Sequence, residues 1–292
     1  MRMYSSIIIA ALSAVAFWIV VDSASKLYIK KLGKELASVA VLAAGIIPML
    51  LLFIAYGTFN LSNVSLLLAV GAAGGAALFL GYLFVYKSVP EGGVANSYML
   101  VEVQPPLLIL FGIFALGEHL SALQLVSMIV IFAGVSLIVF TKELRLDRRL
   151  APALAGNVMW AAYWFIVVLA VLHYRNFIAP LLLVRIFGTI FAYAYYKYAK
   201  SKHAAHSAPK MHNIGFAMMA LALLAGIFDG SGNLLFSFVA FSNRLAIGSA
   251  ILSMEPIIIW FVGFLAYKES ITRLQKIGFA ISVVGYMLLS IL

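Results

Sequence analysis

The residues most able to do chemistry in this sequence are charged and polar side chains that interrupt long apolar runs. Arg185 follows Leu182-Leu183-Val184, and Asp229 is followed one helical turn later by Asn233. A guanidinium binds carboxylates or phosphates bidentately. We therefore expect Arg185 either to contact such a group of a ligand or to form a structural ion pair. For Asp229, pairing with Arg185 is the structural alternative to a place in the wall of a ligand cavity.

Two further carboxylates lie close to prolines in similar surroundings. Glu102 precedes Pro105 by three residues, and Glu255 stands directly before Pro256. Ionisable groups inside a membrane commonly mark substrate or proton pathways, so either carboxyl could carry a proton that is coupled to transport. The alternative is a carboxyl that caps backbone groups freed by the neighbouring proline.

Hydroxyl and aromatic residues complete the candidate ligand site. Aromatic faces attract cationic groups, which suits amines or aromatic solutes, although aromatic residues also form belts at the membrane surface. The sequence predicts that the following residues help to bind substrate: Tyr98, Ser249, Ser253, Trp18, Trp160 and Tyr163.

Patterns typical of enzymes and metal sites are missing from the sequence. The chain has no cysteine, which excludes disulfides, thiolate metal sites and cysteine nucleophiles. It also lacks His-Glu-x-x-His, Gly-x-Ser-x-Gly and a phosphate-binding glycine loop. We therefore expect no catalytic residues, no metal and no cofactor.

The composition places these residues in a lipid environment. Of the 292 residues, 65% are hydrophobic and 10% are charged, and the mean hydropathy is +1.09. Soluble chains carry about a quarter charged residues. The net charge of +10 lies mainly in short segments between apolar runs, so we expect it to set membrane orientation and contact anionic lipid, not nucleic acid.

The apolar runs predict an all-α integral membrane protein with ten transmembrane helices, because roughly 20 apolar residues cross a bilayer. The expected spans are 5–22, 35–56, 64–86, 93–116, 121–140, 151–172, 177–198, 213–240, 246–267 and 273–292. The odd-numbered loops hold sixteen Lys and Arg residues, against three in the even loops and termini. By the positive-inside rule both termini lie outside a cytoplasmic membrane.

The chain repeats itself at a spacing of 151 residues. The matched residues are Gly75 and Gly226, Gly81 and Gly232, Pro105 and Pro256, Glu118 and Glu269, and Gly134 and Gly285. Two halves, 1–146 and 147–292, then hold five spans each, and an odd number of spans inserts the second half upside down. Glu118 and Glu269 fall in turns, where we expect them to act as helix caps or topological elements and not as ligands.

Glycines surround Asp229 in the expected eighth span. Gly226, Gly230 and Gly232 either weaken the helix locally, exposing backbone groups to a ligand, or let another helix approach closely. Together with Gly71 and Gly75, they would also let helices slide past one another.

The end of each half resembles an EamA-type domain. The resemblance lies in Pro105-Pro106 through Gly117-Glu118 to Gly134, and in Glu255-Pro256 through Lys268-Glu269 to Gly285. Two such domains in tandem are similar to the drug/metabolite transporter superfamily. The resemblance implies ten helices and transport of small metabolites such as amino acids, amines or sugars, often as export. Members commonly have cytoplasmic termini, the opposite of the orientation that the charge count predicts.

These features together predict a secondary transporter that exports a small metabolite across the cell membrane by alternating access. The alternatives are a flippase for lipid-linked precursors and an intramembrane enzyme. The expected partners are a small-molecule substrate, membrane lipid and protons, and the chain is expected to be a monomer or homodimer.

Overall fold

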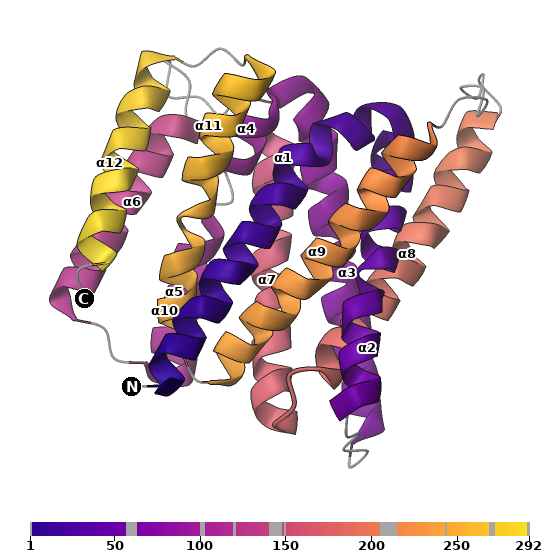
Figure 1. Ribbon diagram of the computed structural model, residues 1–292, viewed down its shortest axis with the longest axis horizontal. Helices are drawn as coiled ribbons and strands as arrows, with labels where there is room; N and C mark the ends of the chain where they lie inside the picture. The colour runs from indigo at the N-terminus through magenta and orange to yellow at the C-terminus, as the bar shows by residue number, and fades with distance from the viewer. Residues whose placement is uncertain are drawn as a thin grey trace.

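The computed structural model describes residues 2–56, 63–99, 103–118, 121–139, 148, 150–204, 215–242, 244–268 and 272–290 (Figure 1). These residues form helices and turns, with no strand among them. The twelve helical segments are α1 (Arg2–Ala44), α2 (Ile46–Tyr56), α3 (Val64–Gly92), α4 (Val94–Met99), α5 (Gln104–Leu116), α6 (Ala122–Val139), α7 (Ala151–Tyr174), α8 (Ala179–Ala204), α9 (Phe216–Phe241), α10 (Leu245–Leu252), α11 (Glu255–Tyr267) and α12 (Arg273–Ser290).

Several of these helical stretches are long and apolar enough to cross a bilayer. Within the described residues, five qualify by length and composition: Ser6–Tyr56, Val64–Gly92, Ala151–Tyr174, Ala179–Lys202 and Phe216–Phe241. The chain is therefore an all-helical, multi-pass membrane protein. Ten crossings, and their inverted arrangement, remain a prediction beyond these five.

The first helix is longer than the expected span 5–22. Helical structure continues to the predicted turn at Lys30 to Lys34, because no proline or glycine interrupts the chain between Asp22 and Leu32. Gly33 then takes φ +76°, a conformation that glycine adopts without the steric cost of a side chain. In Figure 1 the chain rises from the N terminus along α1, turns, and descends through α2.

The prediction of a continuous helix over 246–267 is wrong, because a turn at Ser253 and Met254 separates α10 from α11. Within 93–116, α5 begins at Gln104 after Val103, and residues 100–102 lie outside the described part of the chain. α4 and α5 are separate segments, as are α10 and α11. Each second segment has proline in its first turn, where the missing N–H costs no helical hydrogen bond. α10, α11 and α12 begin 151 residues after α4, α5 and α6, so the sequence repeat is also a repeat of helix boundaries.

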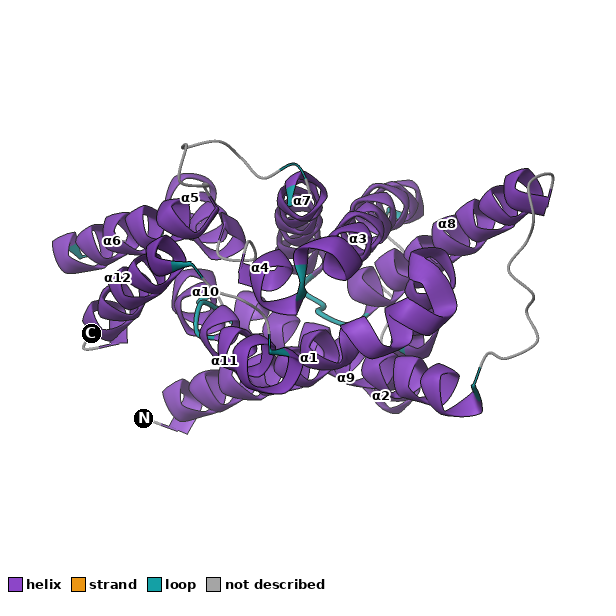
Figure 2. Ribbon diagram, turned by 90° about the horizontal axis from the view of Figure 1, so that it is seen from above, coloured by secondary structure: helices purple, strands orange, loops and turns teal. Residues whose placement is uncertain are grey.

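Helices α6 and α12 pack side by side at one end of the molecule (Figures 1 and 2). The Cα of Gly134 faces Ser282, and its repeat counterpart Gly285 faces Ile131. A higher residue number on α6 therefore meets a lower one on α12, which makes the two helices antiparallel.

The long helices of the two halves also pack in matching pairs, since α1 packs on α9 and α3 packs on α7. At the first contact Trp18 lies against Gly232, and at the second Trp160 lies against Gly81. Gly81 and Gly232 are 151 residues apart, so Trp18 and Trp160 hold corresponding positions in α1 and α7.

The glycines around Asp229 serve close helix packing. α9 is helical throughout, so local unwinding there was the wrong alternative. Gly226 lies against Val41 and Ala44, and Gly230 lies against Gly45. In the other half Gly75, the counterpart of Gly226, lies against Val184, Phe187 and Gly188 of α8. Residues 41 to 45 therefore correspond to 184 to 188, which pairs Leu42 with Arg185.

Glu118 joins the two halves as a helix cap, which confirms its predicted role. Its carboxylate oxygens accept hydrogen bonds from the backbone N–H groups of Leu245 and Ala246, at 3.2 and 3.0 Å. The first N–H groups of a helix have no partner inside the helix, so an anion there satisfies them. Glu269, expected to be the counterpart cap, lies outside the described residues.

Replacing Glu118 with alanine is expected to lower stability by about 1–2 kcal/mol, because the N terminus of α10 loses its acceptor. Thermal unfolding in detergent micelles measures the loss. Glu91→Ala is the matched control, since Glu91 is exposed. Equal unfolding temperatures for the two variants would contradict the capping role.

Candidate functional site

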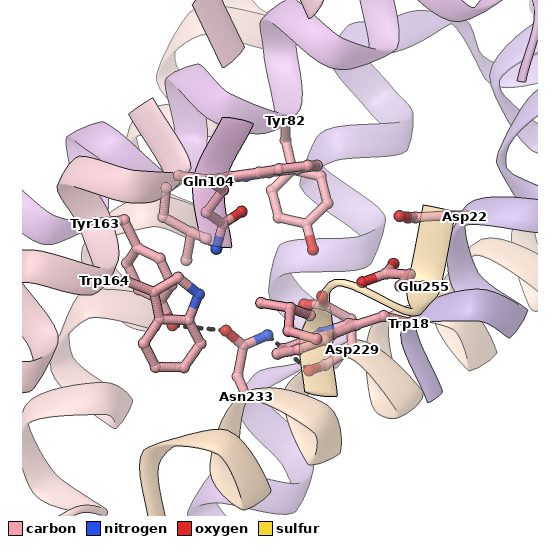
Figure 3. A pocket seen from close by; sticks show the side chains of 12 residues that line it. Trp18, Asp22, Tyr82, Gln104, Tyr163, Trp164, Asp229, Asn233 and Glu255 are labelled. Atoms are coloured by element: carbon pink, nitrogen blue, oxygen red, sulfur yellow. Dashed lines mark hydrogen bonds between the residues drawn. The ribbon is translucent and has the colours of Figure 1, made fainter. Parts of the chain in front are cut away.

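A cavity lies where the two halves meet (Figure 3). It is lined by Trp18, Asp22, Leu78, Tyr82, Gln104, Trp160, Tyr163, Trp164, Asp229, Asn233, Leu252 and Glu255.

The wall of the cavity is built from corresponding positions of the two halves. Three of the matches follow the spacing of 151: Leu78 with Asp229, Tyr82 with Asn233, and Gln104 with Glu255. The remaining two follow the packing of α1 and α7: Trp18 with Trp160, and, one turn later, Asp22 with Trp164. These five pairs supply ten of the twelve lining residues, so the cavity lies at the junction between the repeats.

Arg185 has structural partners beside the cavity. Its guanidinium forms an ion pair with Asp229 and donates hydrogen bonds to the carbonyl groups of Leu42 and Val41, at 3.1 and 3.0 Å. Those carbonyls belong to the last turn of α1, where helical N–H donors run out. Arg185 is 1% exposed and is not among the lining residues, so the structural ion pair is the alternative that this geometry favours.

Asp229 fulfils both of its alternatives, because it pairs with Arg185 and also lines the cavity. Asn233, one turn later, donates to the backbone carbonyl of Asp229 at 2.7 Å and accepts from the Tyr163 hydroxyl at 2.6 Å (Figure 3). The Asn233 amide is thereby fixed in orientation by one bond on each side. These contacts tie α7 to α9 at the cavity wall.

The predicted aromatic residues line the cavity together with two more. Trp18 meets Trp164 edge-on, with ring centroids 6.3 Å apart. Tyr82 meets Trp160 edge-on at 5.3 Å, and Tyr163 packs against Trp164 at 4.9 Å. Edge-to-face contacts are the preferred geometry of aromatic pairs, so the rings hold one another in place. The positions of Trp18, Trp160 and Tyr163 agree with an aromatic wall, not a lipid-facing belt.

Asp22 and Glu255 face each other on one side of the cavity (Figure 3). Both residues are buried, and their side chains are close enough to interact. Asp22 comes from α1, and Glu255 is the first residue of α11, at the break that precedes Pro256. The break therefore places a polar group in the wall, as discontinuous helices do in transporter sites.

The other predicted site residues lie outside the lining. Tyr98 is buried and close enough to Asp22 for their side chains to interact. Ser249 and Ser253 are buried at the end of α10, where the Ser253 hydroxyl donates to the Ser249 carbonyl at 3.0 Å. Glu102 falls outside the described residues.

Four polar or aromatic lining residues were not predicted as site residues: Asp22, Tyr82, Gln104 and Trp164. The sequence repeat could have identified two of them. Tyr82 and Gln104 stand 151 positions before Asn233 and Glu255, which were both singled out from the sequence. Asp22 and Trp164 each follow a predicted tryptophan by one helical turn and so share its face.

Comparison with known proteins places the chain in a family. A solved structure described only as "Crystal structure of protein" is 19% identical, covers 98% of this chain and 97% of its own, and superposes with a TM-score of 0.64, so it shares the fold. No curated protein matches the sequence. A family model described as "EamA-like transporter family" matches twice, over residues 5–140 and 150–291. These two matches span nearly the whole chain in tandem, and the chain belongs to the EamA-like transporter family.

Proposed function

We propose that this protein is a secondary transporter that exports a small metabolite, such as an amino acid or amine, across the cytoplasmic membrane by alternating access. The observation that carries the proposal is the composition of the cavity wall. Corresponding positions of the two halves line the cavity together. A membrane transporter of small solutes is the role of the family. The position of the cavity supports solute binding at the junction of the two halves.

The packing of the halves supports the alternation. α4 packs on α11 and α10 packs on α5, so the first segment of each broken helix meets the second segment of the other. With the antiparallel contact of α6 and α12, this is the arrangement expected of inverted repeats. In such a pair, one half can adopt the conformation of the other, which would open the cavity to the opposite side.

The lining also indicates the kind of solute. Five aromatic side chains offer apolar and π surface, while amides and carboxyls offer a few fixed polar contacts. Ligand sites commonly combine a mostly apolar wall with a small number of placed polar groups. A solute with an apolar body and one or two polar groups would satisfy this wall.

Transport by purified protein in proteoliposomes tests the proposal. Vesicles loaded with labelled amino acids and amines should release them faster than empty-membrane controls. Asn233→Leu is expected to slow transport at least ~10-fold, because it removes a polar contact and leaves the buried Tyr163 hydroxyl without its acceptor. Ser136→Leu is the control, since Ser136 is exposed on α6 and bonds within its own helix. No flux above background, or equal slowing by both variants, would refute the proposal.

The orientation is a separate part of the proposal. We infer from the lysine and arginine distribution that both termini face away from the cytoplasm. A reporter that is active only outside the cytoplasm should therefore work when fused after Leu292. Activity of a reporter that works only in the cytoplasm, fused at the same place, would show the opposite orientation. It would not affect the conclusion of the transport assay.

A further inference from the structure

The carboxyl pair formed by Asp22 and Glu255 is unusual for a buried site. Asp22 is 7% exposed and Glu255 is 3% exposed, and their side chains are close enough to interact. They come from different halves of the chain and meet at the edge of the cavity, with both carboxyls turned toward its interior (Figure 3). When one of two neighbouring carboxyl groups carries a proton, it can donate a hydrogen bond to the other.

Electrostatics favours a single proton in this pair. Two carboxylates in contact repel strongly where water is scarce, so they do not both ionise. One negative charge remains favourable, because Glu255 lies in the first turn of α11, at the positive end of the helix dipole. These two effects together favour one proton and one negative charge on the pair.

The neighbouring helices supply the other titratable and charged groups around the pair. Asp229 of α9 has its charge balanced by Arg185 of α8. Lys26, one turn after Asp22 on α1, places its ammonium group 5.1 Å from the centre of the Tyr267 ring of α11. The phenol groups that face this region are Tyr28 of α1, Tyr82 of α3, Tyr98 of α4 and Tyr163 of α7.

We propose that the Asp22–Glu255 pair binds the ammonium group of an amine substrate in exchange for its shared proton. This inference rests on the proposed transport function and names its substrate class. The ammonium group enters, both carboxyls become carboxylates that hydrogen bond to it, and the proton leaves to the water on the open side. One positive charge enters as one leaves, so the exchange is electroneutral and no covalent bond changes.

The aromatic wall strengthens the choice of a cation over an anion. Trp18 stands one turn before Asp22 on the same helix, and Trp160 lines the same cavity. Indole faces attract ammonium groups, by about 0.5–2 kcal/mol depending on desolvation. An anionic substrate would need Arg185, whose guanidinium is already held by Asp229 and two carbonyls.

Binding of phenethylammonium to the purified protein tests this exchange. Its uncharged isostere 2-phenylethanol is the matched ligand control. Isothermal titration in two buffers that differ in ionisation enthalpy should show close to one proton released per ammonium bound. Affinity for phenethylammonium should weaken up to ~10-fold per pH unit as pH falls and protons compete for the pair, whereas affinity for 2-phenylethanol should stay constant.

Variants locate the exchange in the pair. Asp22→Asn and Glu255→Gln should each weaken phenethylammonium binding at least ~10-fold and abolish proton release. Glu91→Gln, at an exposed carboxyl of α3, is the control and should change neither. Size-exclusion profiles verify folding of each variant. If a variant does not fold, proton release and pH dependence of the unmodified chain decide the matter.

The outcomes separate this inference from the transport function. Equal affinity for phenethylammonium and 2-phenylethanol, binding without proton release, or no binding of phenethylammonium, putrescine and tetraethylammonium would overturn the carboxyl-pair proposal. Flux of uncharged or anionic solutes that is sensitive to Asn233→Leu would then leave the transporter standing. If no solute is transported but ammonium binding is intact, the transport function is refuted and the ammonium-binding proposal stands.

Discussion

Replacing Arg185 with leucine is expected to destabilise the protein by about 3–5 kcal/mol, the usual cost of breaking a buried ion pair on one side. The change leaves Asp229 as a buried charge without its partner and removes the donors from the Leu42 and Val41 carbonyls. Thermal unfolding in detergent, together with the yield of monodisperse protein, measures the loss.

The double variant Arg185→Leu with Asp229→Leu is expected to recover most of that stability. The corresponding positions in the other half are Leu42 and Leu78, so the fold already accepts two leucines there. Transport should stay low in the double variant, because Asp229 lines the cavity. A double variant less stable than Arg185→Leu alone would show that the ion pair is needed for folding itself.

Gly226→Val is expected to be the second large effect, lowering stability by about 1–3 kcal/mol or more through overpacking. A side chain at Gly226 would meet backbone atoms of Val41, which cannot move aside as a flexible side chain can. The same backbone carbonyl accepts a hydrogen bond from Arg185, so displacing it also disturbs the ion-pair network.

Gly215→Val is the matched control for this change. Gly215 stands just before α9, has φ −58°, and a side chain there meets nothing within 4 Å. Purified proteins compared by thermal unfolding should rank Gly226→Val well below Gly215→Val. Comparable unfolding temperatures would mean that α9 can move away from residues 41–45 at little cost.

The sequence predicted the helical class and the repeat because both depend on local composition and spacing. Long apolar runs require helices in lipid, and matched prolines and glycines mark the same helix boundaries in each half. The breaks before Gln104 and Glu255 were harder to foresee. A proline can kink a helix or begin a new one, and neighbouring helices decide which occurs.

Site residues could be predicted where their polar or charged side chains are costly to place in a membrane span. They could not be predicted where the residue type is common at that position. Asp229, Asn233 and Glu255 stood out because polar groups are rare in apolar spans, and all three line the cavity. Arg185 stood out for the same reason, yet its partners are carbonyls more than 140 positions away. Asp22 fell at the expected end of a span, where an acid is unremarkable until the full length of α1 is known.

The mismatched pairs in the cavity wall have a thermodynamic consequence. In the alternating-access cycle proposed above, identical halves would make the two access states equivalent by symmetry. The states would then have equal free energies and equal populations at rest. Here Asp22 corresponds to Trp164, and Glu255 corresponds to Gln104. In that cycle, each mismatch would contribute differently to the two states. The resting equilibrium would then be unequal, and the solute would meet a different apparent affinity on each side of the membrane.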